Sequence, residues 1–206
     1  VRRQRIVDNL LGGASFCSIV RRTSGLAGMD DNDIRLRCEN ITASYPPDLL
    51  RRALSYLYSK ETKSSFEIES VTPGTTRTER FINLLESASQ KDYCEKSLLL
   101  EVQNHIVDPR FRDTDYRCSQ NYIGQTVSFQ KQLVHYVCPK PGDVADLMDG
   151  LLLSHQSMKR ADLPAIIHAA VVSYGLVFIH PFEDGNGRLH RFLIHNVLSL
   201  RGVVPK

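Results

Sequence analysis

The sequence lacks a paired-cysteine motif. Its cysteines are odd in number and widely separated, and none of them forms a Cys-x-x-Cys pair; they are Cys17, Cys38, Cys94, Cys118 and Cys138. This pattern argues against a disulfide framework and against a zinc site. A reducing, cytoplasmic compartment is therefore the expected location.

Long apolar runs and a strong charge excess are also missing. No stretch approaches the roughly 18 consecutive apolar residues of a membrane span, and the N-terminus lacks an adequate signal-peptide core. Lysine plus arginine exceed aspartate plus glutamate by only 26 to 23, which does not indicate a nucleic acid or a membrane as main partner. With 206 residues, 42% of them hydrophobic, we expect a soluble chain with a sizeable core. Because it opens on Val1, we also expect it to have been trimmed.

The apolar residues present recur mostly with helical period. Stripes spaced three and four residues apart predict amphipathic helices, and the segment 163–179 is apolar nearly all round, as a central buried helix would be. The segments with these patterns are 47–58, 78–88, 141–152, 163–179 and 191–200. Only 120–124 and 133–137 carry strand signals, and their spacing predicts a small hairpin. The expected class is mainly α, a helical bundle with a small β-hairpin.

The polar string HPFEDGNGRLHR, residues 180–191, interrupts this apolar pattern between two predicted core helices. Gly185 and Gly187 would let the backbone turn tightly and present N–H groups at a helix N-terminus, which binds anions. Asn186 offers an amide donor to a phosphate oxygen. Arg188 and Arg191, three positions apart, share a helix face and could both reach a polyphosphate. The loop therefore predicts an anion cradle.

Two further residues of the string suggest chemistry. Asp184 supplies the hard oxygen ligand that Mg²⁺ prefers, and His180 could take a proton from an attacking hydroxyl. Each also has an ordinary structural explanation, because a histidine at a helix end is more often structural and Gly-Asn-Gly is a common turn. Taken jointly, the residues indicate phosphoryl or nucleotidyl transfer.

The whole string resembles the signature of the Fic family, His-Pro-Phe-x-Asp/Glu-Gly-Asn-Gly-Arg-x-x-Arg, without a departure. Upstream, YRCSQNYIG and VHYVCPKPGDVADLMDGL resemble that family's flap hairpin and the helix after it. The resemblance covers about residues 70–200 and implies a Fic-like helical bundle with a flap. It also divides the chain into an N-terminal helical region, 1–69, and a core, 70–206, which we expect to be truncated at its C-terminal end.

Fic enzymes mostly transfer AMP from ATP to a serine, threonine or tyrosine hydroxyl of a target protein. The resemblance implies that His180 deprotonates this hydroxyl, that Phe182 anchors the loop in the core, and that Asp184 holds Mg²⁺ against the α- and β-phosphates. Gly185, Asn186 and Gly187 would form the anion cradle, and Arg188 and Arg191 would clamp the β- and γ-phosphates. The hairpin, with Tyr122, Ile123 and Gly124 in its first strand, would register the target as an added strand.

The segment KSSFEIES, residues 63–70, is similar to the inhibitory helix of many Fic proteins. Ser65 and Glu69 have its Ser/Thr-x-x-x-Glu spacing, and the glutamate would pair with the motif's second arginine, Arg191, so that ATP binds unproductively. Ser70 departs from the usual Gly or Asn, and an ordinary solvated helix face is the competing explanation. We expect the inhibitory helix at about residues 60–69.

Two other functions stay open. A Fic-type transferase could use another donor and transfer UMP, phosphocholine or phosphate, and a regulatory module could sense nucleotide without turnover. The target and the oligomeric state are not indicated, and a homo-oligomer stays open. Among the remaining histidines, His155 is isolated in sequence and His168 sits in an apolar helix, so no metal-ligand spacing is evident. Cys138, beside the predicted flap, is the thiol most worth testing for reactivity.

Overall fold

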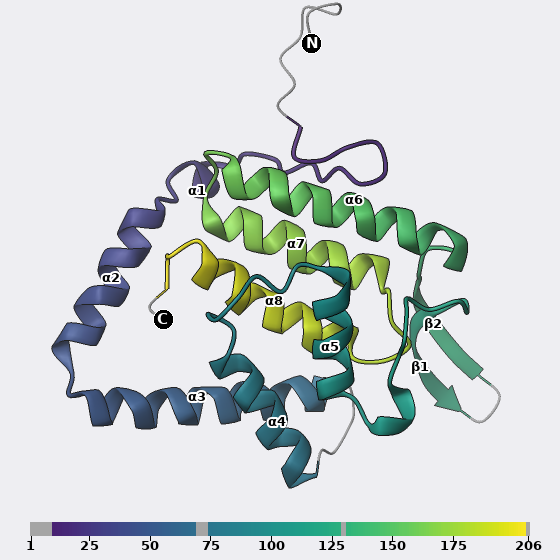
Figure 1. Ribbon diagram of the computed structural model, residues 1–206, viewed down its shortest axis with the longest axis horizontal. Coiled ribbons are helices and arrows are strands. Elements are labelled where there is room, and N and C mark those ends of the chain that lie inside the picture. The colour runs from purple at the N-terminus through teal and green to yellow at the C-terminus, as the bar shows by residue number, and fades with distance from the viewer. Residues whose placement is uncertain (1–9, 69–73, 129–130, 205–206) are drawn as a thin grey trace, which may run out of the picture.

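The computed structural model describes residues 10–68, 74–128 and 131–204, which are mainly helical (Figure 1). The helices are α1 (Ser24–Ala27), α2 (Asp31–Ser44), α3 (Pro47–Ile68), α4 (Thr75–Glu86), α5 (Lys96–Ile106), α6 (Pro141–Arg160), α7 (Ala165–Ile179) and α8 (Asn186–Leu200), with a 3₁₀ turn at Pro109–Phe111. The strands β1 (Tyr122–Ser128) and β2 (Lys131–Val137) pair antiparallel. The expected class, mainly α with a small hairpin, is confirmed.

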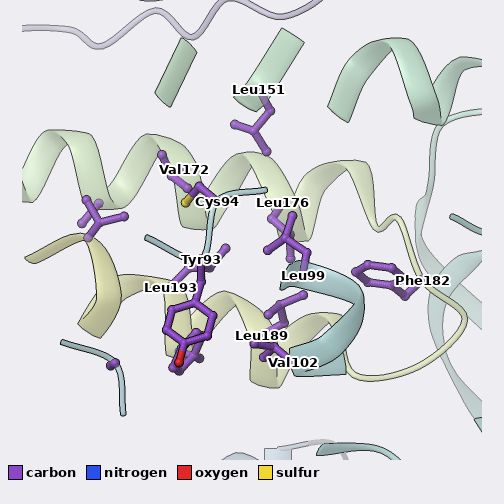
Figure 2. Close-up of a cluster of buried hydrophobic side chains, with 14 of the residues drawn as sticks. Tyr93, Cys94, Leu99, Val102, Leu151, Val172, Leu176, Phe182, Leu189 and Leu193 are labelled. Carbon is purple, nitrogen blue, oxygen red and sulfur yellow. The ribbon is translucent and has the colours of Figure 1, made fainter. Parts of the chain in front are cut away.

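The nearly all-apolar helix α7 forms the centre of the core. It packs against α6 and against α8, and α5 and α4 close over α8 (Figure 1). Figure 2 shows Leu151 of α6, Leu176 of α7, Leu189 of α8 and Leu99 of α5 pointing into one cluster, and all four are buried. Burying an aliphatic side chain of this size stabilises the fold by about 1.5–3 kcal/mol.

The segment before α1 is attached to the α6–α7 pair. Gly175 leaves room for the Phe16 ring, because a Cβ at position 175 would lie 2.8 Å from Phe16 Cζ. The backbone carbonyl of Phe16 accepts a hydrogen bond from Ser154 Oγ at 3.3 Å. At the start of α7, both carboxylate oxygens of Asp31 lie 2.9 Å from the Ala165 backbone nitrogen. The segment before α1 therefore packs on α6 and α7, and Asp31, the first residue of α2, caps α7.

Helices α2 and α3 run along two sides of the molecule and frame α8 (Figure 1). The first half of α3 leaves apolar side chains such as Leu54 and Leu57 half exposed, whereas its second half buries Ser65 and Phe66. The expected inhibitory segment, 60–69, thus falls at the end of α3, except that Glu69 lies outside the described residues. The division of the chain at residues 69 and 70 stays a prediction.

The hairpin is longer than its sequence signals, 120–124 and 133–137. Tyr122 lies opposite Val137, and the pairing continues to Ser128 opposite Lys131, with irregularities after Ile123 and after Thr126. Main-chain hydrogen bonds form a ladder whatever the side chains are, so the polar outer half pairs although it lacks a β-rich composition.

None of the described helices combines the length and apolarity of a membrane span.

Candidate active site

The predicted loop between two core helices is present and connects α7 to α8. His180 caps α7 in the left-handed region, with φ 55° and ψ 61°, and its backbone N–H donates to Leu176 O at 2.8 Å. Gly185 precedes α8 with φ 87°, and a Cβ there would lie 2.8 Å from Val107 Cγ1. Both the backbone conformation and the close packing therefore require glycine at position 185.

Asn186 folds this loop back on itself. Its Oδ1 accepts from the Phe182 backbone N–H at 3.1 Å, and its Nδ2 donates to the Phe182 carbonyl at 2.7 Å. Phe182 is fully buried, with its ring 5.8 Å from that of Tyr116. The Phe182 carbonyl takes one of the two hydrogens on Asn186 Nδ2, so the expected bond from this amide to a phosphate oxygen stays a prediction. Phe182 and Asn186 together hold the loop in shape.

The N-terminus of α8 presents its backbone N–H groups without a capping side chain, and no acidic residue lies in its first turn. Gly185 N–H donates to Asp184 Oδ1 at 2.6 Å. The positions after it, Asn186 and Gly187, begin the helix, where unpaired N–H groups and the helix dipole favour an anion. The predicted cradle of Gly185, Asn186 and Gly187 therefore coincides with a helix N-terminus, and its binding of phosphate stays a prediction.

Both motif arginines lie against α3. Arg188 is 1% exposed; it donates to Ile106 O at 2.8 Å and to Asp184 Oδ1 at 2.9 Å, and its guanidinium lies 5.1 Å from the centre of the Phe66 ring. Arg191 donates through Nη1 to Ser65 Oγ. The end of α3 thus covers Arg188 and contacts Arg191. One turn further along α8, His195 Nε2 lies 2.8 Å from the Glu61 carboxylate of α3.

His180 is held in a form suited to accept a proton. Its Nδ1 lies 3.1 Å from Val177 O, and because a carbonyl only accepts, Nδ1 carries the ring hydrogen and Nε2 is left as the acceptor. Burial lowers the pKa of His180; the hydrogen bond to Val177 opposes this, the charge of Arg117 lowers it further and that of Asp184 opposes it. The imidazole is therefore neutral near pH 7.

Asp184 belongs to a group of three neighbouring carboxylates. Burial raises the pKa of Asp113, and the charges of Glu183 and Asp184 add to this. The Asp113 carboxylate also accepts from the Glu183 backbone N–H at 3.2 Å. Clustered carboxylates repel one another, which agrees with the raised pKa of Asp113. The role of Asp184 as a Mg²⁺ ligand stays a prediction.

Sequence reasoning missed the residues that support the loop from neighbouring segments. Gln103 on α5 is fully buried, and its Nε2 lies 3.1 Å from both Asp184 O and Asp113 Oδ2. Arg117 is 4% exposed and bonds to His180 O at 2.7 Å. Each is distant in sequence from the motif, so no spacing pattern could reveal it, although Arg117 stands within the YRCSQNYIG segment.

The hairpin lies beside the loop and is largely exposed. Tyr122, Ile123 and Gly124, the predicted docking residues, all fall in β1 and are exposed. Tyr136 of β2 attaches the hairpin to α7 through a 2.9 Å hydrogen bond from its hydroxyl to Phe178 O. Cys138, suggested as a reactive thiol, is 3% exposed, and burial raises its pKa. Both effects disfavour the reactive thiolate.

Comparison with known proteins supports the resemblance to the Fic family. The profile of the Fic/DOC family matches residues 93–198, about half of the chain. The protein adenylyltransferase Fic of Drosophila mojavensis is 33% identical over 129 residues, and the match covers 61% of this chain but 23% of that relative. The protein of the same name from Culex quinquefasciatus is 32% identical over 123 residues, covering 57% of this chain and 22% of the relative. The chain thus spans less than a quarter of these relatives.

Solved structures show the same fold at low identity. A Fic family protein from Desulfovibrio desulfuricans superposes with a TM-score of 0.60 at 21% identity, covering 87% of this chain and 58% of the other. A Fic domain containing signaling protein from Bacteroides thetaiotaomicron also gives a TM-score of 0.60, at 18% identity, with 84% and 73% coverage. The arrangement of helices around the loop is therefore one that recurs in solved structures.

Proposed function

This chain belongs to the Fic/DOC family, and we propose that it is a protein adenylyltransferase that moves AMP from ATP to a side-chain hydroxyl of a target protein. The observation that supports this best is the loop itself, in which a neutral histidine, a helix N-terminus and two arginines stand within twelve positions. The relatives that match over this region carry the name protein adenylyltransferase. A reducing, cytoplasmic setting, compatible with five free cysteines, is part of the proposal.

In the proposed reaction, a serine, threonine or tyrosine hydroxyl of the target attacks the α-phosphorus of ATP. The bond from that phosphorus to the bridging oxygen breaks, pyrophosphate leaves, and the hydroxyl proton passes to Nε2 of His180. The neutral form of His180 supports this role. The N–H groups at the start of α8 are placed to stabilise negative charge on the phosphates.

Mg²⁺ would be held by the carboxylate of Asp184, whose hard oxygen suits this ion. The ion would neutralise charge on the phosphates as the bond breaks. Gln103 fixes the backbone of Asp184 and the side chain of Asp113 at once. These two bonds join the backbone of Asp184 to the side chain of Asp113 and would support the orientation of Asp184.

We also propose that the end of α3 inhibits the enzyme. A triphosphate clamped by Arg188 and Arg191 needs access to both guanidinium groups. Phe66 lies over Arg188, which is 1% exposed, and Ser65 accepts a bond from Arg191. Glu69, which follows Ile68 in the sequence, would add a negative charge where the γ-phosphate belongs. Productive ATP binding would therefore require the end of α3 to move.

The flap would dock the target as an added strand beside β1. Its exposed position next to the loop supports this, because main-chain pairing could bring a hydroxyl to His180 without demanding a particular sequence. Exposed apolar side chains on the hairpin, including Ile123, would add contact area.

Labelled donors distinguish the alternatives. Purified protein is incubated with Mg²⁺ and ATP labelled on the α-phosphate or on the γ-phosphate. Protein labelling from the α-position alone supports AMP transfer, and labelling from the γ-position alone indicates phosphate transfer. Labelled UTP and CDP-choline test UMP and phosphocholine transfer. ATP binding without any labelling, also after Glu69→Gly, would support the sensing module and overturn the proposal.

Inhibition is tested by a double-mutant cycle. Glu69→Gly should raise the rate of AMP transfer tenfold or more, about 1.4 kcal/mol or more of restraint. Combining it with Arg191→Ala should remove most of that gain, because the released arginine is then absent. Glu67→Gly, two positions earlier and exposed on α3, is the matched control for the loss of one charge and one side chain. An unchanged rate in Glu69→Gly would contradict the inhibitory assignment.

A further inference from the structure

Arg117 is a buried arginine whose guanidinium binds only backbone carbonyls among the contacts the structure records. It is 4% exposed and lies just before β1. Its Nε donates to His180 O, its Nη1 to Ser119 O and its Nη2 to Pro139 O, each at 2.7 Å. A weaker contact of 3.4 Å joins Nη2 to Ile179 O. Its own backbone N–H donates to Pro181 O at 2.8 Å.

These carbonyls come from two parts of the molecule whose relative position matters for the proposed reaction. Ile179, His180 and Pro181 form the end of α7 and the start of the loop. Ser119 and Pro139 flank the two strands of the hairpin, one before β1 and one after β2. A planar guanidinium offers its donors in a fixed fork, so it fixes relative position as well as distance.

We propose that Arg117 is a positioning residue that sets the flap against His180, so that a target strand docked on the hairpin places its hydroxyl at the imidazole. The effect of Arg117 on catalysis rests on the proposed function. The connection that Arg117 makes between the flap and the loop is independent of that function. A further contact at the same junction agrees with it: Ser119 Oγ donates to the Glu183 carboxylate at 2.5 Å.

The backbone of His180 explains why such a clamp is needed. A non-glycine residue in the left-handed region is strained by about 1–2 kcal/mol, and His180 is the non-glycine residue with positive φ among those described. Charge-assisted bonds to carbonyls at the C-terminus of a helix are stronger than neutral ones and match the helix dipole. Arg117 therefore holds His180 in a conformation that its own preference disfavours.

The charge of Arg117 has a second effect, on the protonation of His180. The charged groups that act on this imidazole are Arg117, which lowers its pKa, and Asp184, which raises it; burial lowers it and the Val177 carbonyl raises it. Removing the positive charge should therefore raise the pKa of His180, and the acidic limb of the pH–rate profile should move to higher pH. If Arg117 only filled space, its removal would not have to raise the pKa of His180.

The test compares Arg117→Lys, which keeps the charge but loses the planar fork, with Arg117→Gln, which loses both. Arg112→Gln is the matched control, because Arg112 is an exposed arginine with a single recorded bond to a carbonyl, Asn104 O at 3.2 Å. In protein without ATP, NMR titration follows His180, and hydrogen exchange follows the amides of β1 and β2. Labelling of the protein itself by α-labelled ATP is then measured against pH, in each variant combined with Glu69→Gly.

We expect the pKa of His180 to rise in Arg117→Gln and to stay near its original value in Arg117→Lys. Flap amides should exchange faster in both variants, and kcat should fall on the order of 10- to 100-fold at saturating ATP. Unchanged flap exchange in Arg117→Lys, or an unchanged His180 titration in a folded Arg117→Gln, would overturn the inference. If Arg117→Gln does not fold, the hydrogen exchange of the β1 and β2 amides in Arg117→Lys tests the inference by itself. Absence of AMP transfer by every protein, including wild type and Glu69→Gly, would instead refute the proposed function.

Discussion

Helix α7 carries a histidine near each end, and the two have different surroundings. His168 is 1% exposed, and its Nε2 lies 3.0 Å from His155 Nδ1 on α6. His155 Nε2 lies 3.0 Å from Asp92 Oδ2, which also accepts from Lys159 at 2.7 Å. His180, at the other end, bonds through its ring to the carbonyl of Val177, three positions earlier on the same helix.

Burial lowers the pKa of both histidines, so their protonation does not distinguish them. Their partners do. The Asp92–His155–His168 chain ends on a carboxylate, which only accepts, so His155 Nε2 carries a proton and the contact between the two imidazoles needs one proton between them. This chain uses its polar atoms to join α6, α7 and the segment before α5. In the proposed reaction, His180 would instead use Nε2 to accept the substrate proton, so one end of α7 would contribute stability and the other would support chemistry.

The largest expected effect of this difference is on rate. His180→Ala should lower AMP transfer roughly 10²- to 10⁴-fold, because it removes the base that takes the hydroxyl proton, while ATP binding persists. His168→Leu should keep most of the rate of the folded enzyme. Initial labelling rates with α-labelled ATP, and ATP binding by calorimetry, measure both. Full labelling by His180→Ala would remove this residue from the mechanism.

The second effect is on stability. His168→Leu leaves His155 Nδ1 buried without its partner, and an unsatisfied buried polar atom costs about 1–3 kcal/mol. Urea denaturation followed by circular dichroism should show a loss in the free energy of unfolding within that range. His180→Ala should lose less, since its Nδ1 partner is a carbonyl of its own helix. Equal losses in the two variants would contradict the division of roles.

The third effect is on the pH dependence of stability. Burial lowers the pKa of His168 from 6.5 to about 3. Above pH 6.5 the histidine is neutral in both states, and its contribution to stability is fully present. As the pH falls from 6.5 towards 3, the unfolded chain binds a proton that the folded chain does not, so stability is lost, by up to about 1.4 kcal/mol per pH unit for one group. Denaturation between pH 7 and 4.5 should give a shallower slope for His168→Leu.

The sequence predicted most of the fold because periodicity reports which helix faces are buried. Segments within α3, α4, α6, α7 and α8 all showed it. Helix α5 was missed although Leu99, Val102 and Ile106 are buried at helical spacing, a signal that could have been used. Helix α2 has no buried residue among its 14, so it carries no apolar stripe to detect.

The candidate site divides in the same way. The loop 180–191 is contiguous, so its residue types and spacing could be interpreted without coordinates. The pairing of His155 with His168 could not, because His155 is isolated in sequence and its contact with His168 is made only in space. These residues lie on different helices and meet only when α6 packs on α7. Arg117 and Gln103 were missed for the same reason, since they reach the loop from segments 63 and 81 positions away.

The smallest expected effect concerns the exposed end of the histidine chain. Lys159 donates to Asp92 at 2.7 Å, but its side chain is 38% exposed, whereas that of His155 is fully buried. Water stabilises an exposed ammonium group almost as well as a carboxylate partner does. Lys159→Met should therefore change the free energy of unfolding by about 0–1 kcal/mol. Urea denaturation at low and at high salt measures this, with His168→Leu as the reference for the buried end. A loss in Lys159→Met as large as that of His168→Leu would mean that the exposed ion pair, and not the buried imidazoles, stabilises this end of α7.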